Sequence, residues 1–285
     1  MLSCPAPVLS PRSLAEALDL RARHPEARPL AGGTDLMVEL EAGHAAAAAY
    51  LNLWGLPDLS GLSGDASQGL RLGALTTFRD LARAEAAPAV LRDTARTIGA
   101  AQIQARATLG GNIANASPAG DSLPVWLALG ASFELASVRG ARIVPADRFF
   151  QAYRAVDLAA DELLVAVHVP PWRHEGGEDR HVYRKVGTRL AQAISKVVFA
   201  GRLRLVQGVV TECALAMGSV APTPVRLRAV EAALVGRAPD PAAADQISFD
   251  IKPIDDVRST AEYRLSVARG VVRAWLDGQA RAASV

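Results

Sequence analysis

The stretch LAGGTDLMVEL, residues 30–40, places two adjacent glycines between a short apolar segment and a threonine, an aspartate and a helix-like run. Glycine lacks a Cβ, so successive glycines can adopt positive φ and turn their backbone N–H groups toward one point. Such a nest binds an anion, most often phosphate. The alternative is a simple tight turn, which is the usual role of an isolated glycine pair.

A second corner of the same kind occurs in ATLGGNIANASPAGDSLPVWLALGASFEL, residues 107–135. Both corners consist of an apolar residue, two glycines and a small polar side chain, which is Thr34 in the first and Asn112 in the second. Two nests could hold the two halves of a diphosphate. The GxGxxG and GxxxxGK patterns are both missing from the sequence, so we expect a dinucleotide-binding fold other than the Rossmann fold or the P-loop.

Composition narrows the possible partners. Half of the 285 residues are hydrophobic, and 31 Lys and Arg against 29 Asp and Glu give a net charge of +2 without a block of like charge. We therefore expect no nucleic-acid or membrane partner, and instead a small molecule or another protein. The amino-terminal stretch lacks a signal-peptide apolar region and no run reaches the length of a membrane span, which predicts a cytoplasmic protein and makes the Asn115 sequon a chance match.

The sequence predicts no metal site and no side-chain nucleophile. Its two cysteines, Cys4 and Cys213, stand far apart and form no CxxC pair. The histidines form no HExxH motif, and we interpret them as surface or strand residues; they are His24, His44, His168, His174 and His181. GxSxG and paired carboxylates at catalytic spacing are also missing, so no catalytic residue is assigned.

Turn-rich segments divide the chain into three parts: a first lobe over 1–57, a second lobe over 58–172 and a carboxyl-terminal domain over 178–285. Ser10 and Pro11 predict the start of an amphipathic first helix. Further helices are expected near 76–86, 89–99 and 122–129, and strands near 28–31, 47–54, 69–75, 132–138 and 162–170. After 178, three strands, a helix near 224–236, a Pro/Ala linker and a last helix predict a sheet with helices on one face.

Several stretches together resemble the FAD-binding medium subunit of the molybdenum hydroxylases, the xanthine dehydrogenase and aerobic carbon monoxide dehydrogenase family. These stretches are AGGTDL, LGALTTFRDLA, ATLGGNIANASPAGDSLPVWLALGA, YRKVGTRLAQAISKV and AEYRLSVARGVVRAW, which follow the family's order over nearly the whole chain. The resemblance implies an α+β protein with a two-lobed FAD-binding domain, related to the vanillyl-alcohol oxidase flavoproteins, followed by a smaller α+β domain with an antiparallel sheet.

The resemblance also implies the residues that bind FAD. The first lobe would contribute Ala31, Gly32, Gly33, Thr34, Asp35 and Leu36, and the second lobe Thr108, Leu109, Gly110, Gly111 and Asn112. Asp121 matches a carboxylate that accepts hydrogen bonds from FAD hydroxyls, Leu164 a contact near the flavin, and Lys185 a lysine close to the cofactor. Taken without the family, these three would be a helix N-cap, a core leucine and a solvated strand lysine. Ile98 stands where some relatives carry an aromatic side chain.

The resemblance further implies a role in electron transfer, with FAD in this chain and NAD as the acceptor. Two cysteines are too few for two [2Fe–2S] clusters. The implied partners are therefore a ferredoxin-like [2Fe–2S] small subunit and a molybdopterin-binding large subunit, assembled as a dimer of heterotrimers. Two alternatives remain open: a stand-alone flavoprotein oxidoreductase of the same fold, and a scaffold subunit that has lost FAD.

Overall fold

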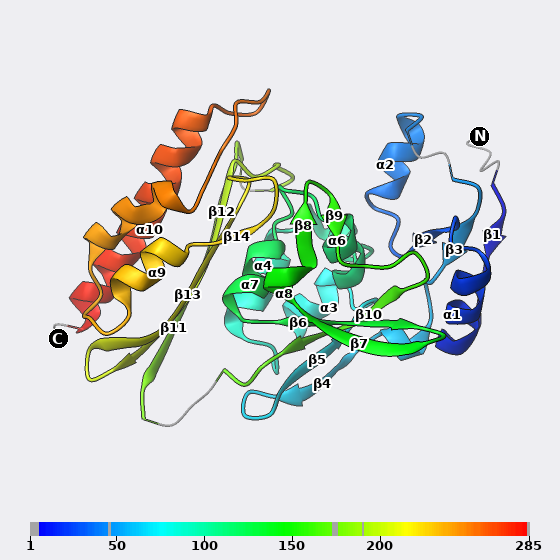
Figure 1. The fold of residues 1–285 in the computed structure, drawn as a ribbon, viewed down its shortest axis with the longest axis horizontal. Coiled ribbons are helices and arrows are strands. Elements are labelled where there is room, and N and C mark those ends of the chain that lie inside the picture. The colour runs from blue at the N-terminus through cyan, green and yellow to red at the C-terminus, as the bar shows by residue number, and fades with distance from the viewer. Residues whose placement is uncertain (1–5, 45–46, 173–175, 190, 284–285) are drawn as a thin grey trace.

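Three main sheets organise the chain. The computed structural model describes residues 6–283 except 45–46, 173–175 and 190. The sheets follow one another along the longest axis of the molecule, from the amino-terminal lobe through a central layer to the carboxyl-terminal layer (Figure 1). No described helix combines the length and the apolar character needed to cross a membrane.

The first sheet is small and parallel, with strand order β1-β3-β2. Its elements are β1 (Val8–Leu9), α1 (Leu14–Arg23), β2 (Arg28–Leu30), α2 (Leu36–Glu41) and β3 (Tyr50–Asn52), followed by the 3-10 helix η1 (Pro57–Leu59). Helices α1 and α2 connect the strands, as parallel pairing requires. The first glycine corner is the turn between β2 and α2, at the carboxyl end of a parallel strand.

The second sheet is antiparallel, with strand order β4-β5-β10-β6-β7. Its strands are β4 (Leu62–Asp65), β5 (Gly69–Gly73), β6 (Ser132–Ser137), β7 (Gly140–Pro145) and β10 (Leu163–Val169). Strand β10 is buried on both faces, with Leu164 and Val167 in the core under the helices and Leu163 and Val165 in the core of the first lobe. This explains its nearly continuous apolar sequence.

Short helices cover the inner face of the second sheet. They are α3 (Phe78–Arg83), α4 (Ala89–Thr97), α5 (Ala101–Gln104), α6 (Leu109–Asn115), α7 (Leu123–Ala128) and α8 (Ala146–Phe149), with a hairpin of β8 (Phe150–Ala152) and β9 (Ala155–Val156) after α8. The second glycine corner forms the first turn of α6. Helix α7 is buried along its whole length because it lies between this core and the third sheet.

The third sheet is antiparallel, in the order β11 (Glu178–Val186), β12 (Val197–Val206), β13 (Val209–Gly218) and β14 (Val225–Arg226). Helices α9 (Arg228–Leu234) and α10 (Ala261–Ala283) and the 3-10 helix η2 (Pro241–Phe249) cover its outer face, while α4 and α7 contact its inner face (Figure 1). The inner face carries small residues at the contact, Ala200 and Ala216, which lets α7 approach closely.

Two sequence predictions of local structure are wrong. The first helix begins at Leu14 with Ser13 as its N-cap, not at Ser10 and Pro11, because the Ser13 Oγ accepts the N–H of Glu16 (3.2 Å). The Pro/Ala segment expected as a linker is the 3-10 helix η2, which Asp240 caps through the N–H of Ala242 (2.8 Å) and whose residue Ile247 is fully buried.

Candidate cofactor site

The two glycine corners touch each other. An added Cβ on Gly32 would lie 1.7 Å from the carbonyl oxygen of Arg106, two residues before Thr108. Only glycine permits this approach, and Gly33 adds a φ of +75°, which also favours glycine. The Arg106 guanidinium lies 3.7 Å from the centroid of the Trp54 ring, so a cation–π contact also ties Arg106 to the segment that follows β3 in the first lobe.

The first corner presents unused backbone donors. Within the described chain, no hydrogen-bond acceptor is found for the N–H groups of Gly32, Gly33, Thr34 and Asp35. The carbonyl oxygens of Gly33 and Asp35 do accept bonds, from Met37 (2.9 Å) and from Val38 (3.1 Å), and these bonds fix the turn. A turn that is held by its carbonyls and leaves successive N–H groups free has the chemistry of an anion nest.

The second corner is built differently, because its N–H groups already have partners. Leu109 donates to the Thr76 carbonyl (3.0 Å) and Gly110 to the Ala74 carbonyl (2.7 Å). Thr108 is the N-cap of α6: its hydroxyl accepts the N–H of Gly111 (3.1 Å), and its carbonyl accepts the N–H of Asn112 (3.1 Å). A ligand that used these donors would share them with the protein acceptors.

The Asn112 side chain connects the second corner to the residues around Asp121. Its Oδ1 accepts a hydrogen bond from the Ser122 hydroxyl (2.7 Å), and Ser122 in turn accepts one from the Trp126 indole (3.2 Å). No acceptor within the described residues is found for the Asn112 amide nitrogen, which leaves it as a donor for a ligand. Ser122 is the neighbour of Asp121, so the second corner lies next to that carboxylate.

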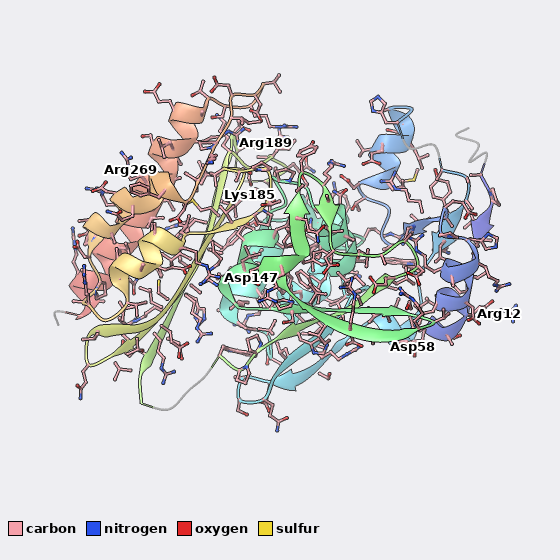
Figure 2. The ribbon with its side chains drawn as sticks, in the orientation of Figure 1. Arg12, Asp58, Asp147, Lys185, Arg189 and Arg269 are labelled. Atoms are coloured by element: carbon pink, nitrogen blue, oxygen red, sulfur yellow. The ribbon has the colours of Figure 1, made fainter. Side chains whose placement is uncertain are left out.

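Asp121 and Lys185 form a buried ion pair between the central layer and β11. The Lys185 Nζ lies 2.6 Å from the Asp121 Oδ2, and the two side chains are 8% and 13% exposed respectively. Lys185 also donates to the carbonyl of Thr97 (3.0 Å) at the end of α4. Figure 2 shows Lys185 on β11, at the side of the third sheet that faces the central layer. An ammonium group has three donors, so one remains for a ligand.

Burial dominates the electrostatics of this pair. It raises the pKa of Asp121, and the charge of Lys185 together with the hydrogen bonds from Lys185 and Ser195 oppose that rise. Tyr183 also reaches the site, with its hydroxyl 3.1 Å from the Thr97 Oγ1 and 3.4 Å from the Asp121 carbonyl oxygen. Burial and the charge of Asp121 raise the pKa of Tyr183, so the phenol stays neutral.

Contacts link several of the sequence-predicted residues: Gly32 meets Arg106 just before Thr108, Asn112 bonds Ser122 beside Asp121, and Asp121 pairs with Lys185. Leu164 differs from the other predicted residues, because it is a buried core leucine of β10. The carbonyl of its neighbour Val165 accepts the N–H of Ala74 (3.0 Å), which places the strand directly behind the second corner. Asp121 is not a helix N-cap, since Ser122 takes that position before α7, and Lys185 is not a solvated strand lysine.

Several residues of the candidate site were not predicted from the sequence. Asp121 is contacted by Ser195 and Tyr183, and Lys185 is contacted by Thr97. The two residues of each contact stand more than 60 positions apart in the chain. Arg106 was also missed, although it directly precedes a predicted segment. Tyr183 and Ser195 do lie in the stretch YRKVGTRLAQAISKV, but the sequence does not reveal these roles, because each residue acts through a contact between distant parts of the chain.

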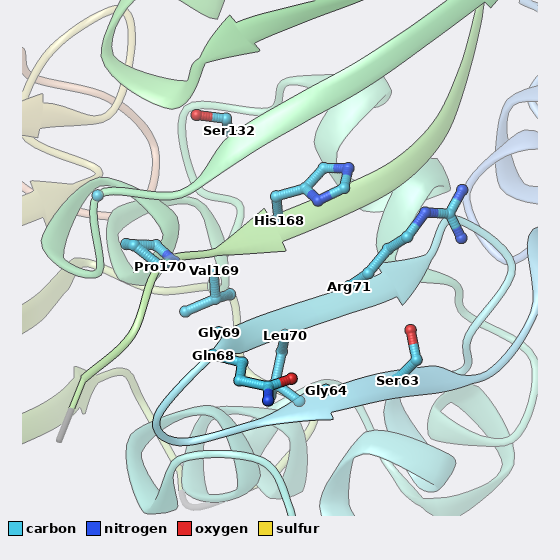
Figure 3. Close-up of a pocket in the computed structure, with 11 residues that line it drawn as sticks. Ser63, Gly64, Gln68, Gly69, Leu70, Arg71, Ser132, His168, Val169 and Pro170 are labelled. Carbon is cyan, nitrogen blue, oxygen red and sulfur yellow. The ribbon is translucent and has the colours of Figure 1, made fainter.

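A separate hollow of about 420 Å³ lies on the exposed face of the second sheet (Figure 3). The Arg71 Nε (3.1 Å) and the His168 Nε2 (2.8 Å) both contact the Glu134 Oε2 beside it. Burial acts to raise the pKa of Glu134, but these two bonds hold it below its ordinary value. The hollow shares no lining residue with the glycine corners, so it is not part of the candidate cofactor site.

Comparisons with known proteins identify the family of this chain. A family model described as the FAD binding domain in molybdopterin dehydrogenase matches residues 4–172, and one described as the CO dehydrogenase flavoprotein C-terminal domain matches residues 181–277. The xanthine dehydrogenase FAD-binding subunit of Escherichia coli O157:H7 is 33% identical over 269 residues, 92% of this chain and 91% of the relative.

Two further relatives come from carbon monoxide dehydrogenases. The medium chain from Afipia carboxidovorans is 32% identical over 272 residues, which are 92% of each chain. The solved carbon monoxide dehydrogenase from Hydrogenophaga pseudoflava, which lacks the Mo-pyranopterin moiety of the molybdenum cofactor, contains a chain that superposes with a TM-score of 0.92 at 30% identity, covering 99% of both chains.

Proposed function

This chain belongs to the family of FAD-binding subunits of xanthine dehydrogenase- and carbon monoxide dehydrogenase-type molybdenum hydroxylases, and from that premise we propose that it is the electron-transfer subunit of such an oxidoreductase. It receives electrons from the [2Fe–2S] clusters of a small subunit and passes them through FAD to NAD⁺. A molybdopterin-binding large subunit oxidises the substrate. The complex is a dimer of heterotrimers in the cytoplasm.

The observation that carries the proposal is the set of free N–H groups at the first glycine corner, held against the second corner. The N–H groups of residues 32–35 bind the FAD diphosphate, and Ala31 and Leu36 flank it. Leu109, Gly110 and Gly111 form the opposing wall, and the Asn112 amide adds a side-chain donor. Thr108 keeps that wall in place as the cap of α6.

The ion pair of Asp121 and Lys185 binds the parts of FAD other than the diphosphate. The Asp121 carboxylate would accept hydrogen bonds from FAD hydroxyls, and the remaining N–H of Lys185 would be available as a charged donor to the cofactor. Leu164 supports the site from the strand behind it. When bound, FAD exchanges electrons singly or in pairs, while the protein supplies position and electrostatics.

The direct test is a titration of the purified chain with FAD, monitored by flavin absorbance and fluorescence. NADH is then added to the FAD-loaded protein. We expect stoichiometric FAD uptake and bleaching of the flavin by NADH. Uptake without bleaching would retain the FAD site and point to oxygen or a quinone as the acceptor. A chain that cannot bind FAD would favour the scaffold alternative.

A further inference from the structure

Ser195 stands out because it is a buried polar residue of the carboxyl-terminal layer whose hydroxyl donates into the site. It is 1% exposed, and its Oγ lies 2.5 Å from the Asp121 Oδ1. The other carboxylate oxygen, Oδ2, contacts Lys185. Each Asp121 oxygen is therefore held by one donor from the carboxyl-terminal layer, and each retains acceptor capacity for a ligand.

The backbone next to Ser195 is fixed at Lys196, through both the N–H and the carbonyl of that residue. The N–H of Lys196 donates to the Val186 carbonyl (2.8 Å), which closes the loop between β11 and β12. The carbonyl of Lys196 accepts a bond from Arg264 (3.1 Å), a residue of α10 that is only 4% exposed. Arg264 also binds the carbonyl of Ser219 (2.7 Å) and the Asp256 carboxylate (2.8 Å). The Ser195 hydroxyl is thus placed by a preorganised support.

We propose that Ser195 is a positioning residue for the cofactor, which acts with Lys185 to hold the Asp121 carboxylate in its ionised form and in the orientation that accepts the FAD hydroxyls. The proposal rests on the proposed function of the site. Without the hydroxyl, Oδ1 would be a buried carboxylate oxygen that has lost its donor, and only Lys185 would oppose the effect of burial, so Asp121 would take up a proton more readily.

The groups around Asp121 allow a clear pH test. Within the described residues, the titratable groups that face Asp121 are Lys185 and Tyr183 on β11, and the Ser195 hydroxyl is its other polar partner. Thr97, at the end of α4, bonds Lys185 and Tyr183. Tyr183 stays neutral because burial raises its pKa. The Ser195 bond lowers the pKa of Asp121 against the effect of burial, so its loss moves protonation of Asp121 to higher pH.

The experiment measures the FAD dissociation constant of the full chain from pH 5 to pH 8.5, for the wild type, Ser195→Ala and Ser195→Thr. Because hydrogen bonds to charged groups are among the stronger ones, we expect Ser195→Ala to weaken FAD binding about tenfold at neutral pH. We also expect the loss of affinity on acidification to begin about one pH unit higher. Threonine keeps the hydroxyl and should stay within about threefold of the wild type.

Two controls separate this role from a structural one. Ser137→Ala removes another buried serine hydroxyl, which accepts the N–H of Arg139 in the β6–β7 turn, and should leave FAD binding unchanged. Ser195→Cys replaces the hydroxyl by a weak donor and serves if the alanine variant does not fold. An unchanged pH midpoint in a folded Ser195 variant, with the wild type binding FAD, would overturn the proposal for Ser195 alone. No FAD binding by the wild type at any pH would instead overturn the proposed function.

Discussion

At the scale of single residues, the site depends on a contact that only glycine can make. Gly32→Ala would place a Cβ 1.7 Å from the Arg106 carbonyl oxygen, so the two corners must separate. We expect a loss of more than about 2 kcal/mol in the free energy of unfolding. FAD affinity should fall at least about tenfold. Urea denaturation and FAD titration measure the two effects.

Gly278→Ala is the matched control for that substitution. Gly278 lies in α10 with nothing within 4 Å of its added Cβ. Alanine is favoured over glycine inside a helix, so this variant should gain about 0.5–1 kcal/mol and bind FAD normally. If Gly32→Ala bound FAD as tightly as Gly278→Ala, the contact between the corners would not be needed for the site.

Lys185 supplies a positive charge, so replacing it should change the midpoint potential of the bound flavin. In Lys185→Met the cation leaves the site, so the reduced flavin loses favourable electrostatics. We expect the midpoint potential of bound FAD to fall by about 30 mV or more, where 30 mV is a tenfold change for a two-electron couple. FAD affinity should fall as well, because Lys185 also holds Asp121, but the flavin that remains bound should show the lowered potential.

The control for Lys185 is Lys196→Met, which removes an ammonium group whose nitrogen lies 4.9 Å from the centroid of the Tyr263 ring. Its potential should match that of the wild type. A Lys185→Met protein that loses FAD while its remaining flavin keeps the wild-type potential would contradict the electrostatic role. Spectroelectrochemical titration measures both quantities.

At the scale of elements, helix α6 holds the second corner through its cap. Thr108→Val keeps the side-chain shape but removes the acceptor for the N–H of Gly111. The loss of an N-cap costs about 1 kcal/mol, or about 2–4 °C in Tm for a chain of this size. We also expect FAD binding to weaken about tenfold, because the corner is no longer fixed.

Ser13→Ala provides the comparison, since Ser13 caps α1 in the same way, through the N–H of Glu16. The Tm of this variant should fall by a similar amount while FAD binding stays unchanged. If the two variants changed FAD affinity equally, the effect of Thr108 would be one of general stability. Thermal melts followed by FAD titration decide between the two outcomes.

Elements also show what the sequence could predict. The apolar run of β10 and the alternation in β6 mark strands because one is buried on both faces and the other on one face. The residue pattern itself predicted the two glycine corners, and the resemblance implied Asp121 and Lys185, because these residues lie in local motifs. Ser195 lies in the same stretch as Lys185, but its role could not be predicted, because its contact with Asp121 crosses from one layer of the molecule to another. The same holds for the contact of Thr97 with Lys185.

At the scale of the whole molecule, the carboxyl-terminal layer completes the central one. Ala200 and Ala216 of the third sheet belong to the same buried core as Leu164 and the helices of the second sheet. Asp147 of α8 and Arg228 of α9 form an ion pair (3.3 Å) across the same boundary. The expected α+β fold of the family is confirmed by the TM-score of 0.92 to a carbon monoxide dehydrogenase chain.

Acid stability is a property of the whole fold that its ion pairs should control. The hydrogen bond from Arg142 is the main reason that the pKa of Glu162 lies below its ordinary value, and burial only partly opposes it. A carboxyl group with a lowered folded-state pKa contributes stability above its unfolded pKa, and loses it as the pH falls through the folded pKa. Glu39 and Asp256 have lowered pKa values as well and act in the same direction.

Arg142→Gln tests this dependence, because Arg142 donates to both Glu162 (2.7 Å) and Asp157 (2.9 Å). We expect the variant to have a lower urea midpoint than the wild type at pH 7 and at pH 5.5, by the same amount at both. Below about pH 4.5, the unfolded pKa of glutamate, the difference should shrink as the carboxylates of the wild type take up protons. A difference that stays constant down to pH 3 would mean that Arg142 stabilises the β6–β10 region through packing of its side chain and not through its charge.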